Sequence, residues 1–152
     1  MGAAYFYHLT QRPLELALPQ LLERALANGW RVVVRGRDAG HISWLDEQLW
    51  LKPDDGFLPH GLAGGAQDAA QPVLLTTGAD VPNKAVCLMT VDGAEVSAPE
   101  VETMERVCVV FDGNDAGAVQ AARVQWKTLT DAGCSAQYWS EESGRWEKKA
   151  EK

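Results

Sequence analysis

Strand-length apolar runs alternate with stretches of helical periodicity along this chain, and the alternation constrains its fold more than any other feature. The run at 31–35 is rich in β-branched residues, and so is the run at 107–111. Because a strand, a helix and a further strand in succession usually build parallel pairing, the pattern predicts an α/β domain. We expect a mostly parallel sheet with helices on both faces, with strands at 4–9, 31–35, 73–76, 85–89, 107–111 and 135–139.

Two helices are predicted in the first third of the chain. The first opens at Pro13, and Pro19 inside its periodic pattern implies either a kink or a later start. Asp38 is placed to cap the second helix. The apolar face expected for that second helix consists of Ile42, Trp44, Leu45 and Leu49.

Length and charge limit the organisation and the partners of the protein. The 152 residues fit a single domain, which we place at 1–139, followed by a charged C-terminal tail at 140–152 that is expected to fray apart from Trp146. The net charge is −7, whereas proteins that bind DNA broadly neutralise phosphates with clustered Lys and Arg. Any role near DNA is therefore expected to be indirect, through a protein partner.

The chain lacks the marks of a membrane or secreted protein. No apolar run approaches the roughly 20 residues that a membrane span needs, and the first residues do not resemble a signal peptide. The three cysteines, Cys87, Cys108 and Cys134, are far apart and odd in number. They predict buried small hydrophobes rather than a disulfide framework or a zinc site. We expect a cytoplasmic protein.

The sequence contains no close match to a known motif for catalysis or cofactor binding. The best nucleotide candidate is the turn at 35–40, which lacks the G-x-G-x-x-G spacing and puts Asp38 where a phosphate would sit. The three histidines show no ligand spacing, and no nucleophile elbow is present. No catalytic residue, cofactor or metal site is predicted, and the protein is expected not to be an enzyme.

The last long helix, predicted from about residue 115 to 132 with Asp115 or Asn114 as its N-cap, has two contrasting sides. Small residues recur on one side, which we expect to lie against the sheet. The other side carries a Trp between two cations, a surface that is costly to leave in water. Either that Trp packs beneath a loop or the C-terminal segment, or the side binds a short acidic peptide ending in an aromatic residue. We call this side the helix stripe: Val119, Arg123, Trp126, Lys127 and Thr130.

A second aromatic feature lies near the end of the second helix. Trp50 closes that helix, and Phe57 opens a new apolar stretch. Both residues are either part of the core or an exposed anchor for a partner.

Four short motifs are spread along nearly the whole chain. They are Phe-Tyr-His-Leu at 6–9, Asp-Glu-Gln-Leu-Trp at 46–50, Phe-Leu-Pro-His-Gly-Leu-Ala-Gly at 57–64 and Gly-Arg-Trp-Glu-Lys at 144–148. In these motifs, of which the one at 57–64 is the most specific, the chain resembles the chi subunit family of bacterial DNA polymerase III. The resemblance implies a nucleotide-binding-like fold without a nucleotide and an accessory role at the clamp loader.

In that family chi pairs with the psi subunit and binds the acidic, Phe-terminated C-terminal tail of single-stranded DNA-binding protein. The resemblance assigns Arg123, Trp126 and Lys127 to tail binding, while Thr130 stands where the best-known members have a further basic residue. Trp50 and Phe57 match an aromatic pair linked to psi or to a competing helicase. Two alternatives to this adaptor role stay open: a small nucleotide-binding α/β enzyme, and direct binding of single-stranded DNA through exposed Trp residues.

Overall fold

A computed structural model of the protein describes residues 2–51 and 59–152. In this part of the chain eight strands form one sheet, in the order β3-β4-β2-β5-β6-β1-β7-β8. Neighbouring strands are parallel, except that β7 and β8 pair antiparallel. The predicted mostly parallel α/β fold is therefore confirmed. The strands are β1 (Ala3–Leu9), β2 (Val32–Arg35), β3 (Gly61–Leu62), β4 (Val73–Thr76), β5 (Cys87–Thr90), β6 (Arg106–Asp112), β7 (Ser135–Ser140) and β8 (Glu147–Glu151).

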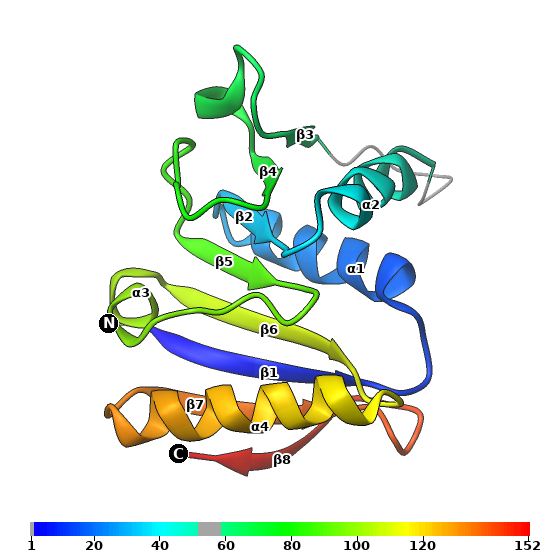
Figure 1. Ribbon diagram of the computed structural model, residues 1–152, viewed down its shortest axis with the longest axis vertical. Helices are drawn as coiled ribbons and strands as arrows, with labels where there is room; N and C mark the ends of the chain where they lie inside the picture. Colours follow the sequence, from blue (N-terminus) through cyan, green and yellow to red (C-terminus); the bar gives the residue numbers. More distant parts are fainter. Residues whose placement is uncertain (1, 52–58) are drawn as a thin grey trace.

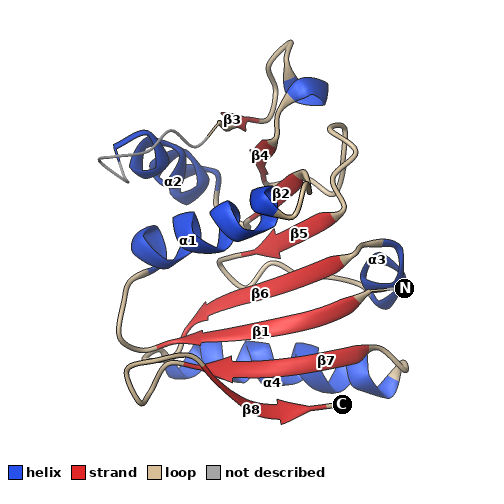
Figure 2. Cartoon of the chain, turned by 180° about the vertical axis from the view of Figure 1, so that it is seen from behind, coloured by secondary structure: helices blue, strands red, loops and turns tan. Residues whose placement is uncertain are grey.

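Helices cover both faces of the sheet, as Figures 1 and 2 show from opposite sides. Alternate side chains of β2 enter two separate cores: Val32 and Val34 pack with the first two helices, and Val33 packs with the last two. None of the helices in the described ranges is both long and apolar enough to cross a membrane. The helices are α1 (Leu14–Ala27), α2 (Ala39–Leu51), α3 (Ala98–Thr103) and α4 (Ala116–Asp131), with a 3-10 turn at Asp68–Ala70.

Side-chain caps determine where α2 and α4 begin. The Asp38 carboxylate accepts the backbone N–H of Gly40 at 2.9 Å, which confirms its predicted role at the start of α2. Asp115 accepts the N–H groups of Gly117 and Ala118 at 2.9 and 3.3 Å, so Asp115 rather than Asn114 caps α4. Both carboxylates also lie where the positive end of a helix dipole favours negative charge.

Helix α1 begins at Leu14 and continues through Pro19, so the hypothesis of a later start is wrong. A proline inside a helix removes one backbone hydrogen bond. The helix nevertheless forms, because the side chains around Pro19, such as Leu18 and Leu22, are fully buried against the sheet. Burial of each large aliphatic side chain contributes about 1.5–3 kcal/mol, which offsets the missing bond.

The structure differs from the predictions in two segments. Residues 57–72 are predicted to form a loop rich in Gly and Ala, yet in the described part of this segment Gly61 and Leu62 form β3, which pairs parallel with β4. The tail was expected to fray apart from Trp146, yet β8 pairs with β7. Trp146 itself packs edge-on against Tyr7, with ring centroids 5.3 Å apart, in agreement with the exception made for it. Charged residues along β8 suit an edge strand, where they discourage pairing with other chains, and this is why its composition resembled a tail.

A fully buried carboxylate ties the C-terminal hairpin to the central strand β1. Oε1 of Glu141, just after β7, accepts the backbone N–H groups of Thr10, Gln11 and Arg12 at 3.1, 3.0 and 3.1 Å. The Nε of Arg12 donates to Oε2 at 3.1 Å, so both oxygens of the carboxylate are bonded. Such charge-assisted bonds in a buried position are stronger than neutral ones. The loop between β1 and α1 is therefore folded around Glu141.

We predict that Glu141→Ala lowers the free energy of unfolding by about 3 kcal/mol, because removing one partner of a buried ion pair leaves the other groups unsatisfied. Urea denaturation followed by Trp fluorescence measures this loss. Glu142→Ala is the matched control, since its exposed side chain predicts a change within about 0.5 kcal/mol. Equal stability of the two variants would contradict the role given to Glu141.

Candidate functional site

The helix stripe lies along one flank of α4, where this helix meets β1 and β7. The sheet-facing line of α4 consists of Ala122 and Leu129, both buried. At about 100° per residue, Trp126 lies next to this line rather than opposite it. The prediction that the stripe faces away from the sheet is therefore wrong for Trp126. Ala122 is buried in the core between α4 and the sheet, and Trp126 is partly buried against the same core.

Trp126 rests on two aromatic side chains of the sheet. Its ring is edge-on to Phe6 of β1, with centroids 5.3 Å apart, and edge-on to Tyr138 of β7 at 6.0 Å. Val119, about two helical turns earlier, is half-buried against the same cluster. Neither a loop nor the C-terminal segment is needed to explain why the indole is half-buried. The rings of Trp126 and Tyr138 are both partly exposed, and we call the surface that they form the aromatic wall.

The polar side chains of the helix stripe differ in how free they are to bind a ligand. Lys127 pairs with Asp131 at 3.1 Å on the exposed side of the helix. The Thr130 hydroxyl donates to the backbone carbonyl of Trp126 at 2.8 Å. Arg123 is exposed and forms no ion pair with any residue that the structure describes. Arg123 is thus the most available cation beside the aromatic wall.

Sequence reasoning did not single out Tyr138 and His8, which complete this surface. The Tyr138 hydroxyl and His8 Nδ1 are 2.6 Å apart. Burial raises the pKa of Tyr138, while the nearby charge of Arg123 lowers it and that of Glu142 raises it. His8 lies directly over Gly113, where an added Cβ would come within 1.8 Å of the imidazole. The available signal was a glycine in the turn between β6 and α4, but its partner was not evident from the sequence.

The second predicted surface lies on the other face of the sheet. Trp50 is 55% exposed at the end of α2, so the hypothesis that it belongs to the core is wrong. Its ring centroid is 4.3 Å from that of the buried His60. Phe57 lies outside the described residues. Large apolar side chains exposed here form what we call the α2 patch: Trp44, Trp50, Leu51 and Leu62.

Trp44 was predicted on the buried face of α2 and is instead 38% exposed. The buried residues Ile42, Leu45 and Leu49 already fill the sheet-facing side at helical spacing. Trp44 therefore points outward and stacks on His41, with ring centroids 5.5 Å apart.

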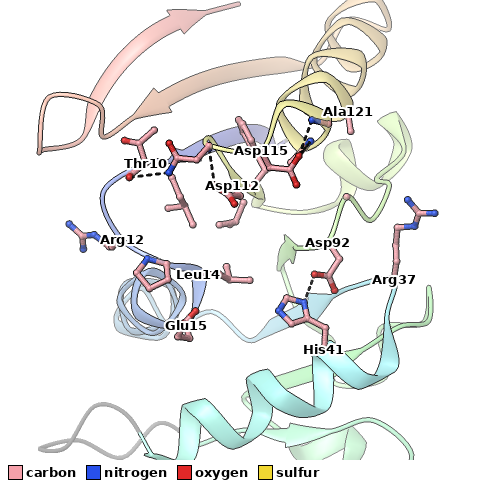
Figure 3. Close-up of a pocket in the computed structure, with 18 of the residues that line it drawn as sticks. Thr10, Arg12, Leu14, Glu15, Arg37, His41, Asp92, Asp112, Asp115 and Ala121 are labelled. Atoms are coloured by element: carbon pink, nitrogen blue, oxygen red, sulfur yellow. Dashed lines mark hydrogen bonds and ion pairs between the residues drawn. The ribbon is translucent and has the colours of Figure 1, made fainter.

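A cleft of about 780 Å³ opens at the carboxyl ends of β1, β2, β5 and β6 (Figure 3). Open α/β folds bind nucleotides at this edge, using helix N-termini and the first loop after a strand. Here the chain's own carboxylates take those donors: Asp38 at α2, Asp115 at α4 and Glu141 at the loop after β1. His41 points to Asp92 and pairs with it. Several of the donors that would bind a phosphate are thus already bonded to carboxylates, and the negative charge of these carboxylates argues against the nucleotide-dependent enzyme.

The three cysteines are free and buried, as predicted for small hydrophobic residues. Cys87 and Cys108 lie in the core between α1 and the sheet, and Cys134 lies in the core beneath α4.

By its fold, the chain is an α/β protein with one mostly parallel eight-stranded sheet in its described residues and helices on both faces. Its residues 1–137 match the family described as DNA polymerase III chi subunit, HolC. It is also 22% identical over 111 residues to the probable DNA polymerase III subunit chi of Rickettsia prowazekii (strain Madrid E), an alignment covering 70% of this chain and 67% of that protein. The chain therefore belongs to the chi subunit family. It is accordingly an accessory subunit of DNA polymerase III in DNA replication.

We predict that Trp126→Ala lowers the free energy of unfolding by about 2 kcal/mol, since a half-buried indole contributes less than the roughly 3–5 kcal/mol of a fully buried one. Arg123→Ala is expected to change stability by less than about 0.5 kcal/mol, because the side chain is exposed. Thermal and urea denaturation of both variants measure the difference. An unchanged stability of Trp126→Ala would show that the indole is not part of the packing between α4 and the sheet.

Proposed function

We propose that the protein is a non-catalytic adaptor that joins the polymerase assembly to single-stranded DNA-binding protein by binding the acidic, Phe-terminated tail of that protein. The observation that carries this proposal is the available guanidinium of Arg123 beside the half-exposed wall formed by Trp126 and Tyr138. An aromatic side chain packs on such a wall, and the acidic groups next to it pair with the cation. DNA is then reached through that partner, in the cytoplasm.

The contacts within the stripe rank its residues for this role. Arg123 supplies the main charge, because Lys127 must share its ammonium group with Asp131. Thr130 uses its hydroxyl on the helix backbone and offers mainly its methyl group. Val119 extends the apolar wall at one end. We infer that affinity depends chiefly on Arg123 and Trp126.

The α2 patch supports a second interaction. Four large apolar side chains of α2 and β3 are at least 38% exposed, and exposed apolar surface is typical of sites that bind another protein. We propose that this patch, with Trp50 and Phe57, binds the psi subunit or a competing helicase. Trp is frequent among the residues that dominate binding energy at such interfaces.

For the first surface, we predict micromolar binding of a peptide with the tail sequence. Arg123→Ala is expected to weaken binding by about 1–3 kcal/mol, as for loss of a charged hydrogen bond. Isothermal titration calorimetry measures both affinities. Added salt should weaken the wild-type complex, because part of the attraction is ionic.

Arg37→Ala provides the matched control for this titration. Arg37 is also an exposed arginine, but it lines the cleft rather than the helix stripe. Equal loss of affinity in the two variants, or none in Arg123→Ala, would remove the helix stripe as the binding site.

For the second surface, we predict that Trp50→Ala abolishes co-purification with the psi subunit or reduces its affinity at least tenfold, as expected for a central aromatic anchor. Peptide binding at the helix stripe should stay unchanged, because the two surfaces lie on opposite faces of the sheet. Val124→Ala, a truncation of an equally exposed apolar residue on α4, is the control. Undiminished psi binding by Trp50→Ala would exclude the α2 patch.

A further inference from the structure

One part of the sheet face that carries α1 and α2 is left without a helix. Figure 2 shows β1, β7 and β8 on this face with no helix of the described residues in front of them. The aromatic side chains on this part of the sheet are only partly buried. We call the surface that they form the open face: Tyr5 of β1, Trp30 just before β2, Trp139 of β7 and Trp146 just before β8.

Arg106, at the start of β6, brings a positive charge onto the open face. Its guanidinium lies 4.2 Å from the centroid of the Tyr5 ring and 5.1 Å from that of the Trp30 ring. Neither Arg106 nor the exposed Arg24 of α1 forms an ion pair within the described residues. Burial raises the pKa of Tyr7, whereas the positive charges of both arginines lower it, so both charges act at this ring. Two unpaired cations therefore border the open face.

The carboxylate of Glu151, beside this surface, is already neutralised. Glu151 lies in register with Gln137 of β7, whose amide donates to Oε2 at 3.0 Å. Lys148, in register with Trp139, donates to Oε1 at 3.2 Å. The two unpaired arginines therefore leave the open face positive, in contrast to the net charge of −7 for the whole chain.

Aromatic rings beside unpaired guanidinium groups match the chemistry of a single-stranded nucleic acid. Its bases stack on aromatic side chains and on guanidinium planes, and its phosphates pair with the cations. Tyr5 and Trp139 lie on neighbouring strands and are offset by two residues, so adjacent bases of an extended strand can reach both rings. A second copy of the chain fits less well, because a two-fold contact would bring the same arginines together.

We propose that the open face binds single-stranded nucleic acid directly, with bases stacked on Tyr5 and Trp139 and the phosphate backbone at Arg106 and Arg24. The helix stripe lies in the core on the other face of the sheet, so this contact goes beyond the proposed adaptor role and does not depend on it. It adds a direct contact to the indirect one expected from the charge of the whole chain. Because that charge repels phosphates, we expect a Kd of about 10⁻⁴ M at physiological salt, the weak end of non-specific binding.

Fluorescence anisotropy of a short labelled oligothymidylate, titrated with the full chain at low salt, tests this proposal. Arg106→Gln and Arg24→Gln should each weaken binding about threefold to tenfold and reduce the slope of log affinity against log salt by about 0.7. Arg24→Gln changes an exposed helix position, so it decides the question even if Arg106→Gln does not fold. Arg37→Gln, an exposed arginine at the cleft, is the matched control and should bind about as tightly as the wild type. No binding by the wild type, or equal weakening in Arg37→Gln, would overturn the proposal.

Stacking is tested separately from charge. Trp139→Leu keeps an apolar side chain and removes the ring, so it should weaken oligothymidylate binding about fivefold without changing the salt slope. The same oligothymidylate paired with its complement should bind the wild type more weakly, because its bases are already stacked. Equal affinity for duplex and single strand, or unchanged affinity of Trp139→Leu, would refute the stacking. A dimer seen by sedimentation at high protein concentration, and lost in Trp139→Leu, would instead assign the open face to a second copy.

Discussion

The carboxylate of Glu141 lies where three backbone N–H groups of the loop after β1 converge, and Arg12 neutralises it. A phosphate would occupy the equivalent position in a nucleotide-binding protein of this architecture. By supplying its own anion, the chain keeps the loop geometry without a ligand. The same contact holds the end of β7 beside β1, and with it the strand that carries Tyr138. Both the loop that lines the cleft and the aromatic surface therefore depend on this one buried group.

The surface at α4 is assembled from distant parts of the chain. Phe6 and His8 come from β1, Tyr138 from β7, and Arg123 and Trp126 from α4. The parallel neighbours β1 and β7, together with α4, which connects β6 to β7, bring these side chains together. A rigid sheet holds the aromatic wall in place before any partner arrives, so little side-chain freedom is lost on binding.

Local patterns in the sequence were sufficient for much of the fold, including the parallel strands and the caps Asp38 and Asp115. The pairing of His8 with Tyr138 was not predictable, because it depends on the register between strands 130 residues apart. Strand β8 was missed since its stability comes from backbone pairing and from Trp146 rather than from apolar alternation. Helix α3 was missed as well, although the capping box of Ser97 and Glu100 was visible as Ser-x-x-Glu.

Helix α2 packs in the core on one face of the sheet, and α4 packs in the core on the other face. A ligand bound to one of these helices therefore leaves the other helix accessible. Under the proposed function, one molecule then holds two partners simultaneously without either displacing the other. Once the protein is attached to one partner through the α2 patch, it binds an acidic tail within the same assembly. This second binding step depends on the effective concentration of the tail rather than on its bulk concentration. Micromolar contacts, each quickly broken and remade, are then enough to keep a moving polymerase beside its coated strand.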